Sequence, residues 1–372
     1  MRTWALVLVA LAGCNADHGA ALTDGSVGSD LSFAPAARLP FPQLTLHTTQ
    51  VFSAPQLVTI TYSDFAFRDQ VEKLGDFIVT SQWLAAVGNE YGVGPGVHLK
   101  KAQLPDAGPP TITDAAIVTL LGQLAGAGTI PAPSAQNDQL VYLVYFPTAT
   151  KIDDGTGTIL CPDGYDGYHA SSQLNGVTFA YAVLPDCSGV LDDLTSTVAH
   201  EVIESATDPD DAWYLDVAAG DLWSGLNLEE VGDLCQDEDN VTEAGWALQR
   251  SWSNASAMAG LPPCVPIPEG EVLLDVTPSP AMALKVKAGM STTFTLTGWS
   301  TVPVPDWSLS SAVTDSADFD PMATISGDTI NNGTTSTVTL SVPAGTARGK
   351  VGSAQIFSGP AGKFWPVTVI AN

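Results

Sequence analysis

The sequence is poor in basic residues. Its 372 residues include 13 Lys and Arg against 40 Asp and Glu, which gives a formal net charge of −27. Residues 152–249 contain no Lys or Arg but 21 Asp and Glu. Because such a chain is repelled by phosphate backbones and by anionic lipid headgroups, we expect no nucleic-acid partner. Carboxylates that fold together without a counter-charge become protonated, spread into water or bind a cation.

The sequence also lacks a long hydrophobic run at its N-terminus. The apolar stretch from Trp4 to Ala12 is far shorter than the about 20 residues of a membrane-spanning helix, but it suits a signal peptide over residues 1–13. Leu11-Ala12-Gly13-Cys14 resembles a bacterial lipobox. We therefore expect lipidation of Cys14 and a lipid-anchored, extracytoplasmic protein of the bacterial cell envelope. The alternative is an ordinary secretory signal with an incidental cysteine.

Cysteines are few. The chain has five, and setting Cys14 aside leaves an even number, as expected for two disulfides in an exported protein. Proximity in the sequence pairs Cys161 with Cys187 and Cys235 with Cys264, although four cysteines allow three connectivities. A zinc site made of four cysteines is disfavoured because no CxxC pair is present.

The remainder divides into three parts by composition. Residues 14–45 are rich in Ala, Gly, Ser, Asp and Pro, which predicts a flexible tether. Residues 46–268 alternate strand-like and helix-like segments, including strands at Leu140–Phe146 and Val177–Leu184, and predict an α/β domain with a mixed sheet. Residues 269–372 show short Val/Thr/Leu runs between turn residues, which predicts an immunoglobulin-like β-sandwich with a spacer or adhesive role.

The segment from about Gly189 to Ala206 is the expected functional helix. On a helix, His200 and Glu204 share a face and Glu201 lies about 100° away, as do the two ligands and general base of a zincin helix. Here Glu204 replaces the second histidine. Because Thr207-Asp208-Pro209 ends the helix sharply, a following loop can bring Glu230 back to it. This pattern predicts an α+β, zincin-like core.

The motifs together resemble the exordium or phosphate-induced family of secreted plant cell-wall proteins, in which bacterial members also occur. The resemblance covers roughly Ser63 to Pro266. The stretches that carry it are His200-Glu201-x-x-Glu204-x-x-Thr207-x-Pro209, Trp213-Tyr214, Glu230-x-x-Asp233-Leu234-Cys235, Gly167-Tyr168-His169, Val177–Tyr181 with Cys187, and Gln249–Asn254. The resemblance implies secretion and a role at the cell surface, and it implies no particular reaction.

Two functions follow from these residues. The first is a metal-dependent hydrolase of the zinc metallopeptidase type, in which His200, Glu204 and Glu230 bind the ion and Glu201 accepts a proton from water. Calcium and manganese are alternative ions, because two carboxylates make a hard, anionic ligand set. His169 either polarises the developing oxyanion or completes the cage, unless it is a purely structural histidine.

Three further aspartates have predicted roles in this site. Asp233, one helical turn after Glu230, is expected to contact the other ring nitrogen of His200 and so to orient this ligand without binding the ion itself. Asp208 and Asp210 are alternative third ligands. The second function is a non-enzymatic cell-surface lipoprotein, in which the same residues hold a structural cation or form a hydrogen-bond network. Its C-terminal sandwich then binds a protein, peptide or glycan ligand.

Overall fold

The computed structural model describes residues 33–161, 165–226, 229–313, 316–359 and 364–372. The predicted signal peptide, Cys14 and most of the predicted tether lie outside these residues. Within the described part, the chain from Ala34 to Asn372 forms one compact unit.

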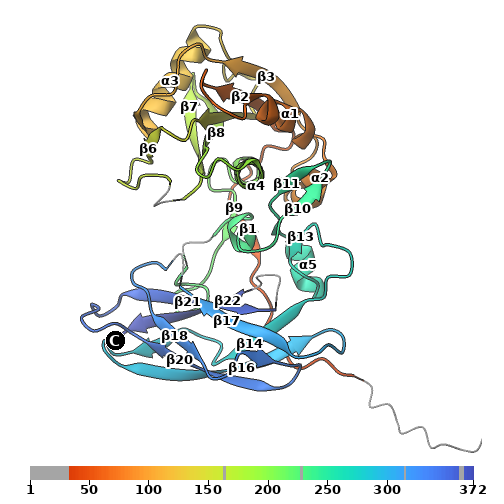
Figure 1. Ribbon diagram of the computed structural model, residues 1–372, viewed down its shortest axis with the longest axis vertical. Helices are drawn as coiled ribbons and strands as arrows, with labels where there is room; N and C mark the ends of the chain where they lie inside the picture. The colour runs from red at the N-terminus through yellow and green to blue at the C-terminus, as the bar shows by residue number, and fades with distance from the viewer. Residues whose placement is uncertain (1–32, 162–164, 227–228, 314–315, 360–363) are drawn as a thin grey trace, which may run out of the picture. The chain divides into compact units, whose positions relative to one another are not determined.

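A five-stranded mixed sheet is the frame of the N-terminal region (Figure 1). Its strand order is β3-β2-β5-β8-β7, with bounds Val97–Gln103, Gln56–Thr61, Leu140–Phe146, Val177–Pro185 and Tyr168–Leu174. Four strands are parallel, and β7 lies antiparallel to β8 at one edge. All residues of β5 are buried, which explains its uninterrupted apolar run. Both predicted strands are confirmed.

Helices cover both faces of this sheet. On one face, α1 (Arg68–Ile78), α2 (Gln82–Gly88) and α4 (Leu191–Thr207) share a hydrophobic core with alternate residues of the strands. On the other face, α3 (Asp114–Gly126) packs against the remaining strand residues. Figure 1 shows α4 beneath β7 and β8, with α3 beyond them. The region is therefore mixed α/β, as predicted.

Shorter elements connect and extend this core. They are β1 (Leu44–Leu46), η1 (Asn89–Tyr91), β4 (Thr111–Thr113), β6 (Lys151–Asp153), β9 (Trp213–Leu215), η2 (Asp233–Cys235), β10 (Val241–Glu243), β11 (Trp246–Leu248), β12 (Ser251–Trp252), α5 (Asn254–Ala259) and β13 (Cys264–Val265). Strand β1 pairs antiparallel with β9. Residues 44 and 45, which the composition assigns to the tether, therefore belong to a two-stranded sheet.

The C-terminal region is largely β and contains two sheets. One is antiparallel, in the order β14 (Leu274–Ser279), β16 (Ser291–Ser300), β20 (Thr335–Ser341), β18 (Met322–Ile325). The other has the order β15 (Leu284–Val286), β22 (Phe364–Ala371), β21 (Val351–Ser358), β17 (Trp307–Ala312), β19 (Thr329–Ile330). Only β15 and β22 are parallel neighbours within the described strands. Phe294 of the first sheet and Ile356 of the second belong to the same hydrophobic core.

Two disulfides join Cys161 to Cys187 and Cys235 to Cys264. This is the pairing that proximity in the sequence favoured. Disulfides persist in oxidising compartments, so they are typical of an extracytoplasmic protein. Among the described residues, none of the helices combines the length and the apolar composition that crossing a membrane requires.

Candidate metal and active site

Helix α4 presents the predicted motif at its C-terminal end. The helix runs from Leu191 to Thr207 and ends where the sequence predicts, with the Asp208 amide donating to the Glu204 carbonyl at 2.7 Å. Glu201 and Glu204 are only 4% and 2% exposed. Two adjacent turns of α4 thus bury two carboxyl groups, which require partners.

Glu204 has partners on both of its oxygens. Oε1 accepts hydrogen bonds from the amides of Gly232 at 2.9 Å and Asp233 at 3.1 Å. Oε2 lies 2.9 Å from His200 Nε2. Burial by itself raises the pKa of Glu204, but the imidazoles of His200 and His169 outweigh it and hold the pKa well below its ordinary value. The carboxylate is therefore ionised, and it ties the loop around Gly232 to α4.

The orientation of His200 follows from Gln249. The Gln249 side-chain Nε2 donates to the Gly232 carbonyl at 2.9 Å, which leaves its Oε1 3.1 Å from His200 Nδ1. Because a carbonyl only accepts, the amide has one orientation and His200 Nδ1 must donate. His200 Nε2 then faces Glu204 Oε2 at 2.9 Å and Asp233 Oδ1 at 3.7 Å. In a neutral ring that donates from Nδ1, the lone pair of Nε2 would face these carboxyl oxygens and be repelled by them. A proton or a cation is therefore needed between Nε2 and the two carboxyl groups.

Asp233 therefore lies on a different side of His200 than the sequence predicted. It faces Nε2, the same nitrogen as Glu204, and the other ring nitrogen belongs to Gln249. Asp233 Oδ2 accepts from the amides of Glu229 and Glu230, both at 3.2 Å. Burial, together with the nearby Glu204 charge, raises the pKa of Asp233 to about 7. Gln249 had no predicted role, and its only signal in the sequence was the family-like stretch Gln249–Asn254.

The second histidine of the site comes from strand β7. Side chains alternate between the two faces of a strand, and Tyr168 donates to Asp114 of α3 at 2.8 Å on the far face. The next residue, His169, therefore points toward α4. Its Nδ1 lies 3.5 Å from both Glu201 Oε2 and Glu204 Oε2. Helix α4 carries one histidine, His200, and the edge of the sheet supplies a second.

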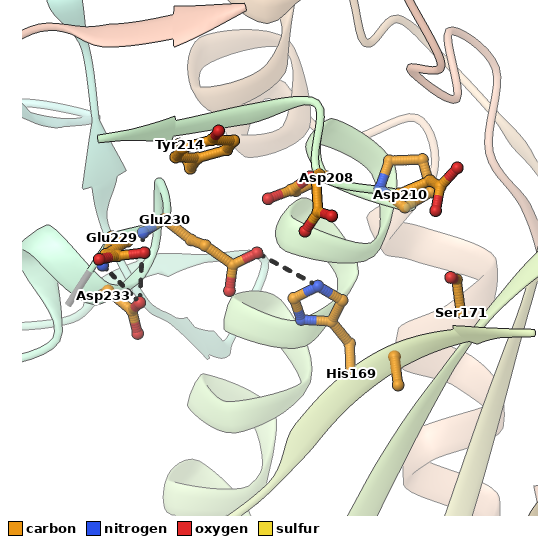
Figure 2. A pocket seen from close by; sticks show the side chains of 11 residues that line it. His169, Ser171, Asp208, Asp210, Tyr214, Glu229, Glu230 and Asp233 are labelled. Atoms are coloured by element: carbon orange, nitrogen blue, oxygen red, sulfur yellow. Dashed lines mark hydrogen bonds and ion pairs between the residues drawn. The ribbon is translucent and has the colours of Figure 1, made fainter. Parts of the chain in front are cut away.

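Glu230 meets His169 and not His200. Glu230 Oε1 lies 3.4 Å from His169 Nε2, as the dashed line in Figure 2 shows. Burial lowers the pKa of His169, but Glu230, Glu201 and Glu204 outweigh it and raise the pKa well above its ordinary value. Burial also raises the pKa of Glu230.

Two groups of candidate ligand atoms, each within 4.8 Å of one another, share Glu204: His169 with Glu201 and Glu204, and His200 with Glu204 and Asp233. Glu230 belongs to neither group. A third group contains Cys161, Asp166 and Cys187, but its cysteines form a disulfide and offer no thiolate. In the group that contains His200 and Glu204 the third member is Asp233, whereas Glu230, the predicted third ligand, lies against His169.

Asp208 and Asp210, the alternative third ligands, directly follow the C-terminal end of α4. Asp208 forms a side-chain hydrogen bond with Glu230, and burial together with this contact raises its pKa to about 7. Asp210 is exposed. Neither belongs to a group of candidate ligand atoms among the described residues.

A cavity of about 680 Å³ opens beside these groups (Figure 2). Its lining residues are His169, Ala170, Ser171, Asp208, Pro209, Asp210, Asp211, Tyr214, Glu229, Glu230 and Asp233. The lining therefore contains six carboxyl groups and no Lys or Arg. It includes one member of each candidate ligand group, His169 of the first and Asp233 of the second. Its size suits a small ligand or one side chain of a larger one.

Comparisons with protein-family models and with curated proteins find no match to this chain. The resemblance to the exordium family therefore stays a prediction from the motifs.

Proposed function

We propose that this chain is an extracytoplasmic metal-dependent hydrolase with a zinc metallopeptidase-like site on a zincin-like domain, followed by an immunoglobulin-like sandwich. One observation carries the proposal. Gln249 orients His200 so that Nε2 is turned toward Glu204 and Asp233. A histidine held through one ring nitrogen, with the other facing carboxylates, is the arrangement of a metal ligand and its supporting residue.

The spacing of the three atoms suits a small divalent cation. Ligand atoms bound at 2.0–2.1 Å in a tetrahedral zinc site lie about 3.3 Å apart. His200 Nε2 is 2.9 Å from Glu204 Oε2 and 3.7 Å from Asp233 Oδ1, values that bracket this separation. We propose zinc as the ion and His200, Glu204 and Asp233 as its ligands. Manganese and calcium are the alternatives, because two of the three ligands are carboxylates.

The surrounding residues complete the reaction chemistry. When bound, a divalent cation lowers the pKa of water and polarises a carbonyl group. Glu201, one residue after His200 and buried, accepts the proton of the attacking water. His169 lines the cavity, and its Nε2 exchanges the 3.4 Å contact with Glu230 for a hydrogen bond to the substrate oxygen that gains negative charge, while Nδ1 stays against Glu201 and Glu204. Before substrate binds, Glu230 keeps the His169 ring in place from the cavity side.

A second candidate function is a non-enzymatic binding lipoprotein, and the surroundings of His169 favour it. Glu201, Glu204 and Glu230 all lie within 3.5 Å of this ring. A protonated His169 balances part of their charge without an ion or a substrate. In this case the cluster stabilises the fold, and the C-terminal region binds a protein, peptide or glycan.

Metal content and a Glu201→Gln variant separate the two functions. Protein purified without chelator is expected to contain about one zinc per chain by elemental analysis and to hydrolyse a pool of quenched fluorescent peptides. Glu201→Gln is expected to keep the ion and lose about 10²–10⁴-fold in rate, since general-base catalysis contributes that much. Glu269→Gln, at an exposed position, is the matched control. A chain without stoichiometric metal excludes the first function, and a metal-loaded chain without turnover supports the second.

We also propose that lipid on Cys14 anchors the chain. The two disulfides account for four of the five cysteines, so Cys14 remains for the modification that the lipobox-like sequence predicts. Expressed in bacteria, the full chain is expected to incorporate labelled palmitate and to fractionate with membranes. Cys14→Ser is expected to abolish both. Labelling that persists in this variant would refute the anchor.

A further inference from the structure

The cavity has two chemically different parts: an inner end beside the proposed ligands and an outer wall further from them. The outer wall is formed by Asp208, Asp210, Asp211 and Glu229 together with the ring of Tyr214. Figure 2 shows Asp208 and Asp210 on the turn that follows α4, with the Tyr214 ring beyond Glu230. The cavity therefore offers carboxylates and one aromatic surface within the same enclosure.

Tyr214 is held in place by its neighbours. It lies on β9, and its ring stacks on His47 with ring centroids 3.7 Å apart and an interplanar angle of 11°. The His47 amide donates to the Ala212 carbonyl at 2.7 Å, which holds the main chain of His47 beside the turn. A backed aromatic ring at the wall of a cavity is a preformed surface for stacking, because it loses little conformational entropy when a ligand arrives.

The carboxylates of the outer wall have no Lys or Arg beside them, and His169, the one basic side chain of the lining, faces Glu201, Glu204 and Glu230. The lining contains no Lys or Arg, and neither does any position from 152 to 249. Asp210 and Asp211 are exposed and follow Pro209 directly. In a concave site, carboxylates of one sign concentrate the field and attract a cation of the ligand.

We propose that this cavity binds the side chain of an arginine in a peptide substrate, next to the bond that is cleaved. The proposal rests on the proposed hydrolase activity and names its substrate class. A guanidinium is planar, so it stacks on Tyr214, and its five N–H groups pair with the exposed carboxylates of Asp210 and Asp211. A lysine ammonium offers neither the planar face nor the forked geometry, so arginine is expected to be preferred.

Matched peptides test this preference. A quenched fluorescent peptide is synthesised with a single arginine at each position around its centre, and with citrulline, lysine or glutamate in its place. Citrulline keeps the shape of arginine but has no charge. At the best position we expect kcat/KM to be about tenfold higher for arginine than for citrulline, equivalent to about 1.4 kcal/mol. The preference is expected to shrink as salt is added.

A double variant links the preference to the wall. Asp210→Asn combined with Asp211→Asn is expected to lower kcat/KM for the arginine peptide several-fold and to leave the citrulline peptide unchanged. Asp239→Asn, an exposed carboxylate outside the cavity, is the control and is expected to change neither. Equal rates for arginine and citrulline in the wild-type chain would overturn the proposal, as would a preference that the double variant retains.

Binding separates this proposal from the hydrolase activity. Calorimetry with the Glu201→Gln chain compares the affinities for the arginine and citrulline peptides without turnover. If the Glu201→Gln chain binds the arginine peptide more tightly but the metal-loaded wild-type chain cleaves neither peptide, the hydrolase is refuted and the cavity assignment is supported. Cleavage without discrimination refutes only the cavity assignment. If neither peptide binds or is cleaved, both are refuted.

Discussion

Gly232 lies against the two side chains that define the proposed ion site. A Cβ atom at this position would be 2.7 Å from Glu204 Oε1 and 2.9 Å from His200 Nδ1. Contacts below 3.0 Å force the neighbours to move, and His200 also has to keep its bond to Gln249. The absence of a side chain at Gly232 is thus part of how the imidazole and the carboxylate are held.

We therefore predict that Gly232→Ala weakens zinc binding by about 10–100-fold, the usual effect of disturbing groups that orient a ligand. The unfolding free energy is expected to fall by about 1–3 kcal/mol because of overpacking. Competition with a chromogenic chelator measures the first effect and urea denaturation the second. An unchanged zinc affinity would contradict the proposed ligand set.

Gly122→Ala is the matched control for this substitution. Gly122 lies within α3, and a Cβ atom there meets nothing within 4 Å. Because alanine is favoured over glycine inside a helix, the control is expected to raise stability by about 0.5–1 kcal/mol and to leave zinc affinity unchanged.

At the scale of elements, α4 begins without a side-chain cap. Val190 occupies the N-cap position in an extended conformation, with φ −111° and ψ 123°, and its side chain caps nothing. Val190 is also 48% exposed, so its apolar side chain contributes little to the core. The first turn of the functional helix therefore keeps amide groups that a short polar side chain would satisfy.

Val190→Ser is predicted to stabilise the chain by about 0.5–1 kcal/mol, because serine caps the amides that valine leaves unpaired. The shift appears as a higher urea midpoint with an unchanged slope. Metal content and hydrolysis are expected to stay the same, since the site lies at the other end of α4. A lower midpoint would show that Val190 contributes more by packing than its exposure indicates.

At the scale of the whole molecule, Arg250 joins three distant segments. Its guanidinium donates to the Cys264 carbonyl and forms a forked pair with Glu271, with Nη1 and Nη2 at 3.0 and 2.8 Å from the two carboxylate oxygens. Nη1 also lies 3.4 Å from Glu238 Oε2. The Arg250 side chain is 1% exposed. A buried cation with this many partners maintains the chain path between the disulfide at Cys264 and the start of the C-terminal region.

Arg250→Met is predicted to cost about 3–5 kcal/mol of unfolding free energy, because it removes a buried cation from the buried Glu238 carboxylate and the half-buried Glu271 carboxylate. Lys350→Met serves as control, since the Lys350–Asp318 pair is exposed, with the lysine side chain 56% accessible. Such pairs contribute about 0–1 kcal/mol. Both values come from urea denaturation, and equal effects of the two substitutions would contradict a structural role for the buried network.

Much of the framework was predictable because its determinants are local. Strands β5 and β8 follow from runs of apolar residues, and α4 begins and ends within two residues of the predicted bounds. The spacing of His200, Glu201 and Glu204 places them on adjacent parts of one helix surface whatever surrounds it. Cysteine count and proximity likewise led to the observed disulfides.

The arrangement of the site itself was decided by the tertiary structure. Sequence spacing led to Glu230 as the third ligand, but the loop turns Glu230 toward His169 and Asp233 toward His200. Gln249 acquires its role only because β11 and β12 bring it next to α4, about fifty residues from His200 along the chain. A helix or a strand is encoded by periods of two to four residues. Which ring nitrogen meets which carboxylate depends on how distant segments pack, and no local pattern carries that information.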